Sequence, residues 1–183
     1  MCAGRKGMMG DKEGIAPVPV RSIGVIRTPF RTAEGTPIMP LYAEGAEGRV
    51  IVDQQWALGL QDVEGFERIW LIYWMDRAVL GALRVVPYRD TRKHGVFATR
   101  SPCHPNPIGL SVVRLLARRG RTLRVADVDM LDGTPLLDIK PYIPAADAHP
   151  GSRAGWFDGA AVDRRLADGR FHEATRPGNR REP

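Results

Sequence analysis

The chain has 183 residues, of which 43% are hydrophobic and 26% charged, as is typical of a globular protein with one ordinary domain and tails. No apolar run approaches the roughly 20 residues of a membrane-spanning helix, and the first residues carry no apolar segment typical of a secretory signal. The net charge of +6 favours a polyanionic partner such as nucleic acid, although a solvated basic surface explains it equally well.

Composition along the chain divides it into three parts. Residues 1–20 are polar and glycine-rich and predict a flexible leader, whereas residues 21–151 predict one compact domain. In residues 152–183 arginines alternate with acids, which predicts a polar extension that is partly disordered. The two cysteines, Cys2 and Cys103, form neither a disulfide framework nor a metal site, so we expect no metal and a reducing cytoplasmic environment.

The compact region consists of short segments rich in β-branched and aromatic residues, separated by glycine and proline. RIWLIYWM is too short for a lone helix, so we predict a buried central strand there. The predicted strands cover residues 22–30, 49–53, 68–75, 95–99, the two halves of 110–131 around a turn at Gly120, and 136–144, with a helical turn within 53–66. This pattern predicts a mainly β fold, a small antiparallel barrel or sandwich, and excludes a doubly wound fold with its GxGxxG motif.

The sequence GVFATRSPCHPNPIGLS, residues 95–111, contains three X-Pro pairs that hold the chain extended. Such a stiff loop presents Arg100, Ser101, His104 and Asn106 at low entropic cost, as a binding loop does. A rigid barrel corner is the alternative that the residues alone leave open.

Three further stretches hold polar groups at the ends of predicted elements. Asp132 and Gly133 predict a tight turn that exposes a carboxylate, although by itself this is only a hairpin turn. The loop 28–40 is long enough to be functional or disordered. Asp76 and Arg77, just past the central strand, either bind a zwitterion or form a surface ion pair of little energy. With no CxxC, HExxH or serine elbow present, the residues alone predict a small barrel with a pre-organised polar site.

Taken together, the segments 22–30, 95–115 and 129–144 resemble the TrmO-type (TsaA-like) family of S-adenosylmethionine-dependent tRNA adenosine-37 N6-methyltransferases. The resemblance covers about Ile23 to Pro144. It implies a β-barrel unlike the Rossmann type, a homodimer with the methyl donor held by loops at one end, and a cytoplasmic protein that needs no membrane. It also implies tRNA as the partner, methylated on N6 of a threonylcarbamoyl-modified adenosine.

The resemblance also implies, position by position, which residues bind S-adenosyl-L-methionine. They are Ile38, Met39, Pro40, Asp76, Arg77, Arg100, Leu110, Asp132, Gly133, Thr134 and Pro135. Arg100 suits the donor's carboxylate, because a guanidinium pairs with a carboxylate bidentately. Asn106 and Ser101 are candidates for orienting the acceptor base, and His104 for removing its proton.

Two places depart from the family's pattern. Cys103 and His104 stand where the family usually has a basic residue before Pro-Asn-Pro, and Ile38 and Met39 replace a common Arg–Gln pair. Because histidine is mostly neutral at pH 7, contacts to an anionic substrate change. Two alternatives follow: a methyltransferase of the same fold acting on a small molecule or another acceptor, and an S-adenosylmethionine-binding protein without turnover. Arginines of the extension are candidates for phosphate contacts or a solvated tail: Arg164, Arg165, Arg176, Arg180 and Arg181.

Overall fold

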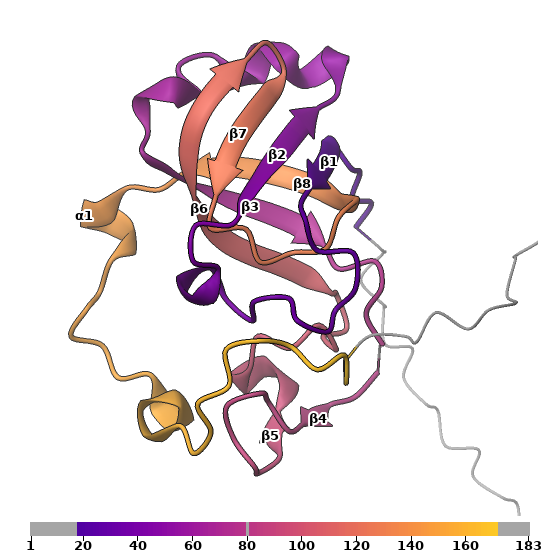
Figure 1. The fold of residues 1–183 in the computed structure, drawn as a ribbon, viewed down its shortest axis with the longest axis vertical. Helices are drawn as coiled ribbons and strands as arrows, with labels where there is room; N and C mark the ends of the chain where they lie inside the picture. The colour runs from indigo at the N-terminus through magenta and orange to yellow at the C-terminus, as the bar shows by residue number, and fades with distance from the viewer. Residues whose placement is uncertain (1–17, 80, 172–183) are drawn as a thin grey trace, which may run out of the picture.

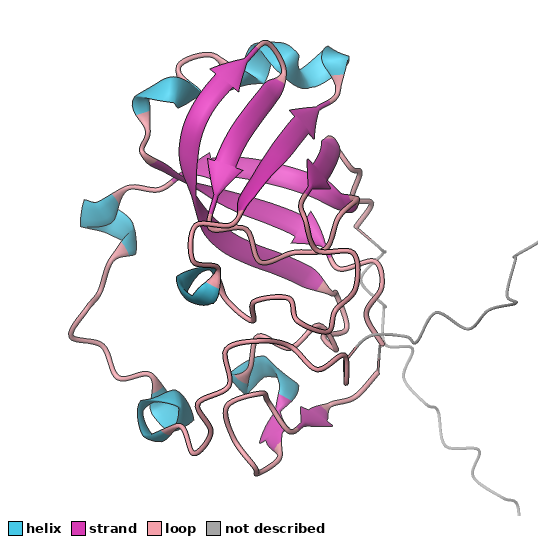
Figure 2. Cartoon of the chain, viewed as in Figure 1, coloured by secondary structure: helices cyan, strands magenta, loops and turns pink. Residues whose placement is uncertain are grey.

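The computed structural model describes residues 18–79 and 81–171, in which six antiparallel strands close into a barrel (Figures 1 and 2). Around the barrel the strands follow the order β1-β2-β7-β6-β3-β8, and β8 pairs back with β1. The strands are β1 (Gly24–Arg27), β2 (Glu47–Val52), β3 (Arg68–Trp74), β6 (Ile108–Arg119), β7 (Thr122–Ala126) and β8 (Thr134–Pro141). The mainly β fold and the small antiparallel barrel are therefore confirmed.

Alternation of side chains along each strand builds the core of the barrel. In β3, Ile69, Leu71 and Tyr73 are buried, while the residues between them are only partly so. β3 pairs along its length with β6 on one side and β8 on the other, which confirms the predicted central strand. The inward residues of the six strands meet in one apolar cluster, which includes Ile26, Val50, Val52, Ile69, Leu71, Val113, Leu123, Val125 and Leu136.

Short turns of helix cover the end of the barrel that is uppermost in Figure 1. They are η2 (Gln54–Leu60) and η3 (Val63–Gly65), and they confirm the helical turn expected after the second strand. The hairpin between β6 and β7 turns at Gly120, whose φ of +58° lies in the left-handed region that glycine adopts without strain. The turn is where the sequence predicts it.

The strand predicted over residues 95–99 is wrong. Only His94–Gly95 form a strand, β5, which pairs with β4 (Arg84–Val85) in a separate small sheet. The residues after it, Val96–Ala98, form the 3-10 turn η4. The turn closes because the amide and the hydroxyl of Thr99 both donate to the carbonyl of Val96, at 3.0 and 2.8 Å. The alternation of the segment does not reveal this capping threonine.

The chain after β8 runs along the barrel through α1 (Pro144–Asp147) and η5 (Gly155–Gly159) and returns across the loops at the lower end in Figure 1. There it pairs with the loop that follows β1, which contains η1 (Pro40–Tyr42). Ile38 N donates to Arg165 O at 3.0 Å, and Ala167 N donates to Thr36 O at 2.8 Å.

Phe171 is buried in a second, smaller apolar cluster with Val85, Val96 and Cys103. The far end of the chain that the structure describes is thus docked on the loops, although most of the predicted leader and residues 172–183 lie outside the described residues. The division of the chain at residue 151 stays a prediction. In residues 18–79 and 81–171 the helices are all too short or too polar to pass through a lipid bilayer.

Candidate functional site

A cavity of about 580 Å³ lies among the loops at the end of the barrel opposite η2 and η3. Its volume is in the range of sites for small molecules and cofactors, about 300–1,000 Å³. Its walls come from the loops after β1, β3 and β7, from the segments before β6 and from the C-terminal segment. The lining residues are those at 33, 36–39, 73, 75–77, 87–89, 97–102, 129–131, 134, 154, 156–157, 167 and 171. Chain segments far apart in the sequence therefore share one concave site.

The structure brings together several of the predicted donor-binding residues. Those that line this cavity are Ile38, Met39, Asp76, Arg77, Arg100 and Thr134. Pro40 and Leu110 line a second cavity, of about 480 Å³, which shares Met39 and Arg100 with the first. Arg100 is exposed and stands at the junction of the two. Asp132, Gly133 and Pro135 lie outside both linings.

The turn at Asp132 positions groups of the cavity. The carboxylate of Asp132 accepts from Thr28 N at 3.1 Å and lies 3.6 Å from the guanidinium of Arg27. Its carbonyl oxygen accepts from Arg77 Nη2 at 2.6 Å. Gly133 has a φ of +82°, as the predicted turn requires. Asp132 therefore holds Arg77 at the cavity, and its carboxylate is already occupied.

Arg77 supplies a direct test of whether the cavity fits a polar ligand. Its Nε is buried and has no hydrogen-bond partner among the residues that the structure describes, and the nearest carboxylate, that of Asp76, is 3.7 Å away. A buried donor left unpaired costs about 1–3 kcal/mol. A ligand with acceptor atoms would remove this cost. The carboxylate and ribose oxygens of S-adenosyl-L-methionine are acceptors of this kind.

Only some residues of the proline-rich loop, residues 100–107, line the cavity. Ser101 is buried and lines it, whereas His104 and Asn106 lie outside its lining. The ring of His104 donates through Nε2 to Thr99 O at 3.1 Å and packs edge-on against Phe97. Of the three candidates for the acceptor side, only Ser101 therefore faces this cavity.

Cys103 in the same loop has a packing role. Its side chain is 4% exposed and lies in the small cluster around Phe171. Burial raises the pKa of its thiol, which keeps it protonated and unreactive. The replacement of the family's usual residue at this position is thus accommodated by apolar packing.

Sequence reasoning missed a hydrogen-bonded chain of side chains beneath the cavity. Tyr73 Oη and Ser111 Oγ are 3.1 Å apart, and Ser111 Oγ donates to Asp129 Oδ1 at 2.7 Å. Burial raises the pKa of Asp129 to about 7, opposed by the hydrogen bond from Ser111 and by the charge of Arg100. Burial also raises the pKa of Tyr73, so its phenol stays protonated. The signal available in the sequence was that Tyr73 and Ser111, which are polar, stand at inward positions of otherwise apolar strands.

Gly109 makes this chain possible. It is the cross-strand partner of Tyr73, and a Cβ atom at Gly109 would lie 2.0 Å from the tyrosine ring. Because no side chain fits there, only glycine lets the ring lie flat enough for its hydroxyl to reach Ser111. The Gly-Leu-Ser sequence thus places a gap and a hydroxyl at successive inward positions of β6.

The model of the tRNA-methyltransferase O N-terminal domain matches residues 25–148, the barrel together with its cavity loops. The chain belongs to the tRNA-methyltransferase O family. The assignments as a methyltransferase and of S-adenosyl-L-methionine as its cofactor are confirmed at the level of that family.

Similar proteins agree with this assignment. A probable S-adenosyl-L-methionine-binding protein of Pyrococcus abyssi is 49% identical over 153 residues, 82% of this chain and 83% of that protein. The tRNA (adenine(37)-N6)-methyltransferase of Escherichia coli K12 is 34% identical over 148 residues, 75% of this chain and 63% of that enzyme. A crystal structure of TrmO from Pseudomonas aeruginosa superposes with a TM-score of 0.67 at 37% identity, covering 78% of this chain and 63% of that one. The match therefore spans under two thirds of the two bacterial TrmO-type proteins.

The match to the tRNA-methyltransferase O domain ends at residue 148, and the segment beyond it forms a wall of the cavity. Its lining residues are Ala154, Trp156, Phe157, Ala167 and Phe171. Arg89 ties this wall to the loops, because its guanidinium lies 5.6 Å from the centroid of Tyr42 and 5.3 Å from that of Phe157. It also donates to Asp163 at 3.0 Å. The sequence predicted only a polar, partly disordered extension here and gave no sign of these contacts.

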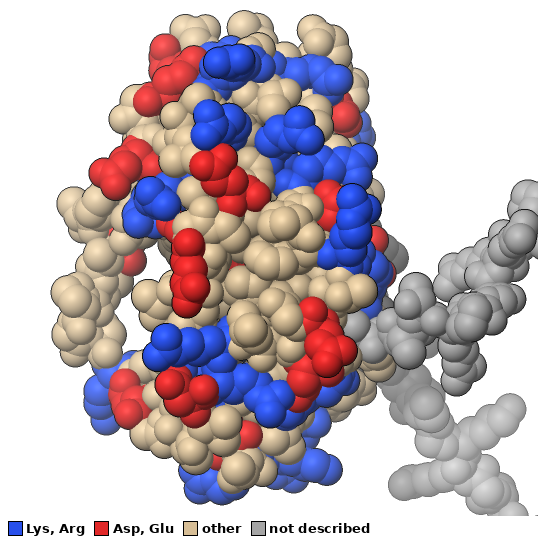
Figure 3. Space-filling view, in the orientation of Figure 1, with Lys and Arg blue, Asp and Glu red and all other residues tan. Residues whose placement is uncertain are grey.

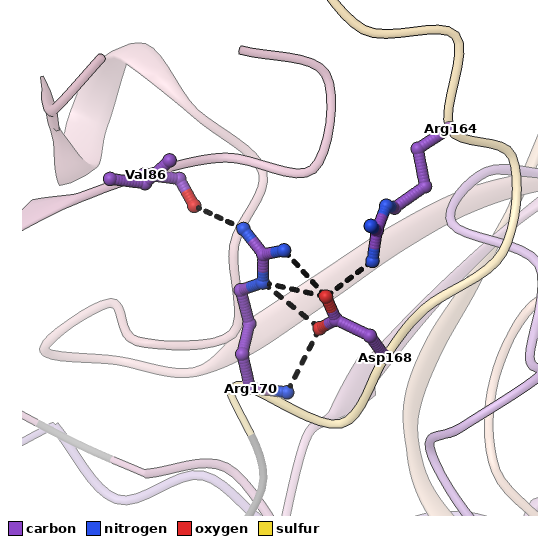
Figure 4. A network of polar contacts seen from close by, with 4 residues as sticks. All are labelled: Val86, Arg164, Asp168 and Arg170. Carbon is purple, nitrogen blue, oxygen red and sulfur yellow. Dashed lines mark hydrogen bonds and ion pairs between the residues drawn. The ribbon is translucent and has the colours of Figure 1, made fainter. Parts of the chain in front are cut away.

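Asp168 is the centre of a polar network that fastens this segment (Figure 4). Its carboxylate accepts from Arg170 Nε at 2.9 Å and pairs with Arg164. Arg165, the next arginine predicted for phosphate contacts, pairs with Asp163 at 3.4 Å. Both arginines therefore serve internal ion pairs of the extension. The remaining three candidates, Arg176, Arg180 and Arg181, lie outside the described residues.

Proposed function

We propose that this protein transfers a methyl group from S-adenosyl-L-methionine to N6 of threonylcarbamoyl-adenosine at position 37 of tRNA. The observation that carries the proposal is the meeting of three separate loops around one cavity, with Ile38, Arg77 and Arg100 among its lining. These are positions that the family resemblance implies for the donor. The E. coli relative, named as an adenine-37 methyltransferase, supports the choice of acceptor.

The residues of the cavity suit the separate parts of the donor. Arg100 can pair with its carboxylate bidentately, and Asp76 can accept from its ammonium group or ribose. Met130 and Leu131 give apolar surface for the adenine. When bound, the donor supplies a methyl group on a sulfonium cation, whose transfer needs chiefly in-line approach in a site shielded from water.

A row of arginines beside the cavity supports tRNA as the acceptor. Arg27 of β1 lies opposite Arg49 of β2, and Arg49 lies opposite Arg124 of β7. All three are exposed, and basic side chains gather over the barrel in Figure 3, with acidic ones among them. Arg27 pairs with Asp132 at 3.6 Å and Arg124 with Glu47 at 3.1 Å. Arg49 has no ion pair among the described residues, so it is the member of the row whose charge a phosphate of a nucleic acid would neutralise. Through Asp132 the row connects with Arg77 at the cavity.

The proposed assembly is a homodimer formed through the outer face of β3 and β6. Ile108 and Leu110 on β6 are 45% and 47% exposed and lie opposite Trp74 and Ile72 of β3. Leu41, 79% exposed, extends this apolar face across the second cavity. Exposed contiguous apolar surface of this kind marks interfaces. A partner seated here would cover the cavity that holds Pro40 and Leu110. We place the protein in the cytoplasm, where its tRNA substrate would be modified.

Methyl transfer from labelled donor to total tRNA tests the function. We expect label with tRNA from cells that make threonylcarbamoyl-adenosine and none with tRNA from cells that do not. Label on a small molecule instead would establish the first alternative. Donor binding by calorimetry without transfer to any extracted acceptor would establish the second, a binding protein without turnover.

Sedimentation of two charge variants tests the dimer. Ile108→Lys places a charge in the proposed interface and is expected to give a monomer. Leu58→Lys is the matched control, because Leu58 is 82% exposed on η2 at the other end of the barrel. A wild-type protein that sediments as a monomer at every concentration would refute the assembly.

A further inference from the structure

The step that the predicted residues leave unassigned is removal of the proton from the acceptor nitrogen. The transfer forms one N–C bond with the lone pair of N6 and breaks one C–S bond, whose electron pair stays on sulfur as a neutral thioether. The nitrogen then carries a positive charge until its N–H proton leaves and the N–H electrons return to it. Some group must accept that proton. The inference below rests on the proposed function.

We propose that Asp129 accepts this proton, with Ser111 and Tyr73 as the residues that position its carboxylate. Asp129 lines the 580 Å³ cavity and is therefore accessible to an acceptor bound there. Ser111 has one hydroxyl proton, which it donates to Asp129 at 2.7 Å. Tyr73 must then donate to Ser111 in the 3.1 Å contact. With Asp129 ionised, the direction of both hydrogen bonds is thus fixed, and the one from Ser111 favours the ionised carboxylate that a base requires.

The other polar groups near the cavity are less suited to this role. His104 lies outside the lining, and its Nε2 already donates to the carbonyl of Thr99. Asp76 is 41% exposed, and its nearest cationic partner, the guanidinium of Arg77, lies 3.7 Å away, so no close hydrogen bond fixes the position of its carboxylate. The phenol of Tyr73 has a raised pKa and serves as a donor. Among the described residues of the lining, Asp129 alone joins a carboxylate to a fixed set of donors.

The electrostatic setting of Asp129 matches its proposed task. Facing it are Tyr73 from β3, Ser111 from β6 and Arg100 from the proline-rich loop, while Asp76 and Arg77 stand elsewhere on the same cavity wall. Burial raises the pKa of Asp129 to about 7, against the lowering effects of Ser111 and Arg100. A base whose pKa lies near the working pH is ionised often enough to act and basic enough to hold the proton.

Asp129→Asn in the full chain is the direct test. We expect kcat for methyl transfer to fall by about 10²–10⁴-fold, the usual contribution of a general base, with the donor affinity measured by calorimetry unchanged. Asp62→Asn is the matched control, because Asp62 is exposed at the opposite end and has a φ of +65°, which asparagine also tolerates. A variant that keeps more than about a third of kcat, or that loses donor binding, would overturn the inference.

Ser111→Ala separates positioning from a merely structural role. Because the hydrogen bond from Ser111 lowers the pKa of Asp129, its removal raises that pKa, and the rising limb of kcat against pH must move to higher pH. The titration of Asp129, followed by NMR through its carboxyl carbon signal without any substrate, must also have its midpoint at higher pH. A pH profile and a titration that stay in place would contradict the proposal.

These outcomes are distinguishable from failure of the proposed function. An active wild type with an equally active Asp129→Asn variant overturns only this inference. If the wild type methylates a different acceptor, the ratio of kcat for Asp129→Asn to kcat for the wild type on that acceptor tests the inference. A wild type without turnover on any acceptor overturns both.

Discussion

The barrel and the layer of loops below it are stabilised in different ways. The barrel encloses a large apolar cluster in which Ile26, Leu71 and Leu123 are completely buried. The loop layer has a small cluster around Val96 and Phe171, and relies on ion pairs such as those of Asp168 and Arg89. Ion pairs that are partly exposed contribute little each. The cavity thus lies in the layer with the smaller apolar cluster, and ligand-binding segments commonly belong to such less stable parts of a protein.

Two aspartates of one loop show the same contrast on a smaller scale. The carboxylate of Asp132 is satisfied by Thr28 N and Arg27 and serves the structure of the turn. Asp129 faces the cavity with one hydroxyl donor and a raised pKa. Identical side chains in adjacent turns of the chain therefore differ in chemistry because their surroundings differ.

Leu123→Ala in the barrel is expected to have the largest effect on stability. Leu123 is completely buried in β7, so the variant should lower the free energy of unfolding by about 2–5 kcal/mol. Urea denaturation measures it. Leu58→Ala, at a residue 82% exposed, should change it by less than about 0.5 kcal/mol. Equal losses in the two variants would mean that the closed barrel is not the main source of stability.

Asp129→Asn should act on stability in the opposite direction. The pKa of Asp129 is raised in the folded state to about 7, so the folded protein binds more protons than the unfolded chain between about pH 4 and pH 7. Stability from this group is therefore lost as the pH rises through that window. At pH 8 the variant should be more stable than the wild type by about 1–3 kcal/mol, since Asn can still accept from Ser111.

Thermal unfolding of both proteins at pH 5 and pH 8 measures this difference. The advantage of the variant should shrink towards pH 5, because the wild-type carboxyl is then protonated. If the variant and the wild type lose the same stability between pH 5 and pH 8, a group other than Asp129 causes the pH dependence.

Phe171→Ala should loosen the loop layer and leave the barrel folded. Phe171 is 6% exposed and packs edge-on against Tyr88 at 5.1 Å. We expect about 1–2 kcal/mol of lost stability and faster hydrogen exchange in residues 84–102. Donor affinity should fall about tenfold, which corresponds to ~1.4 kcal/mol. Phe171→Leu is the conservative control, and unchanged donor binding in the alanine variant would remove the C-terminal wall from the site.

The barrel could be predicted from the sequence because its determinants are local. Alternating apolar residues in β3 and a glycine turn between β6 and β7 specify strands and a hairpin directly. The strand predicted for residues 95–99 was wrong, because Thr99 closes a 3-10 turn there through contacts that an alternating pattern does not encode. Residue pattern thus identifies strands well where one face is buried, and poorly where a loop is held by its own polar groups.

The site could be predicted only in part. The resemblance brought Ile38, Arg77 and Arg100 to one place, and these do line one cavity. It could not indicate that Asp129 meets Ser111, because that contact depends on the register of β6 and on the ring of Tyr73 lying over a glycine. Contacts between strands distant in sequence need the closed barrel before they can be recognised.

The smallest expected effect tests the row of arginines on the wall of the barrel. Arg49 stands between Arg27 and Arg124 on adjacent strands, so Arg49→Ala relieves repulsion and should raise stability by a few tenths of a kcal/mol. If the row binds phosphates, the same variant should weaken tRNA binding, and the slope of log affinity against log salt should fall by about 0.7–0.9. Arg84→Ala, on β4 of the loop layer, is the matched control. An unchanged salt slope with Arg49→Ala would mean that the repulsion in the barrel wall is tolerated without a nucleic-acid ligand.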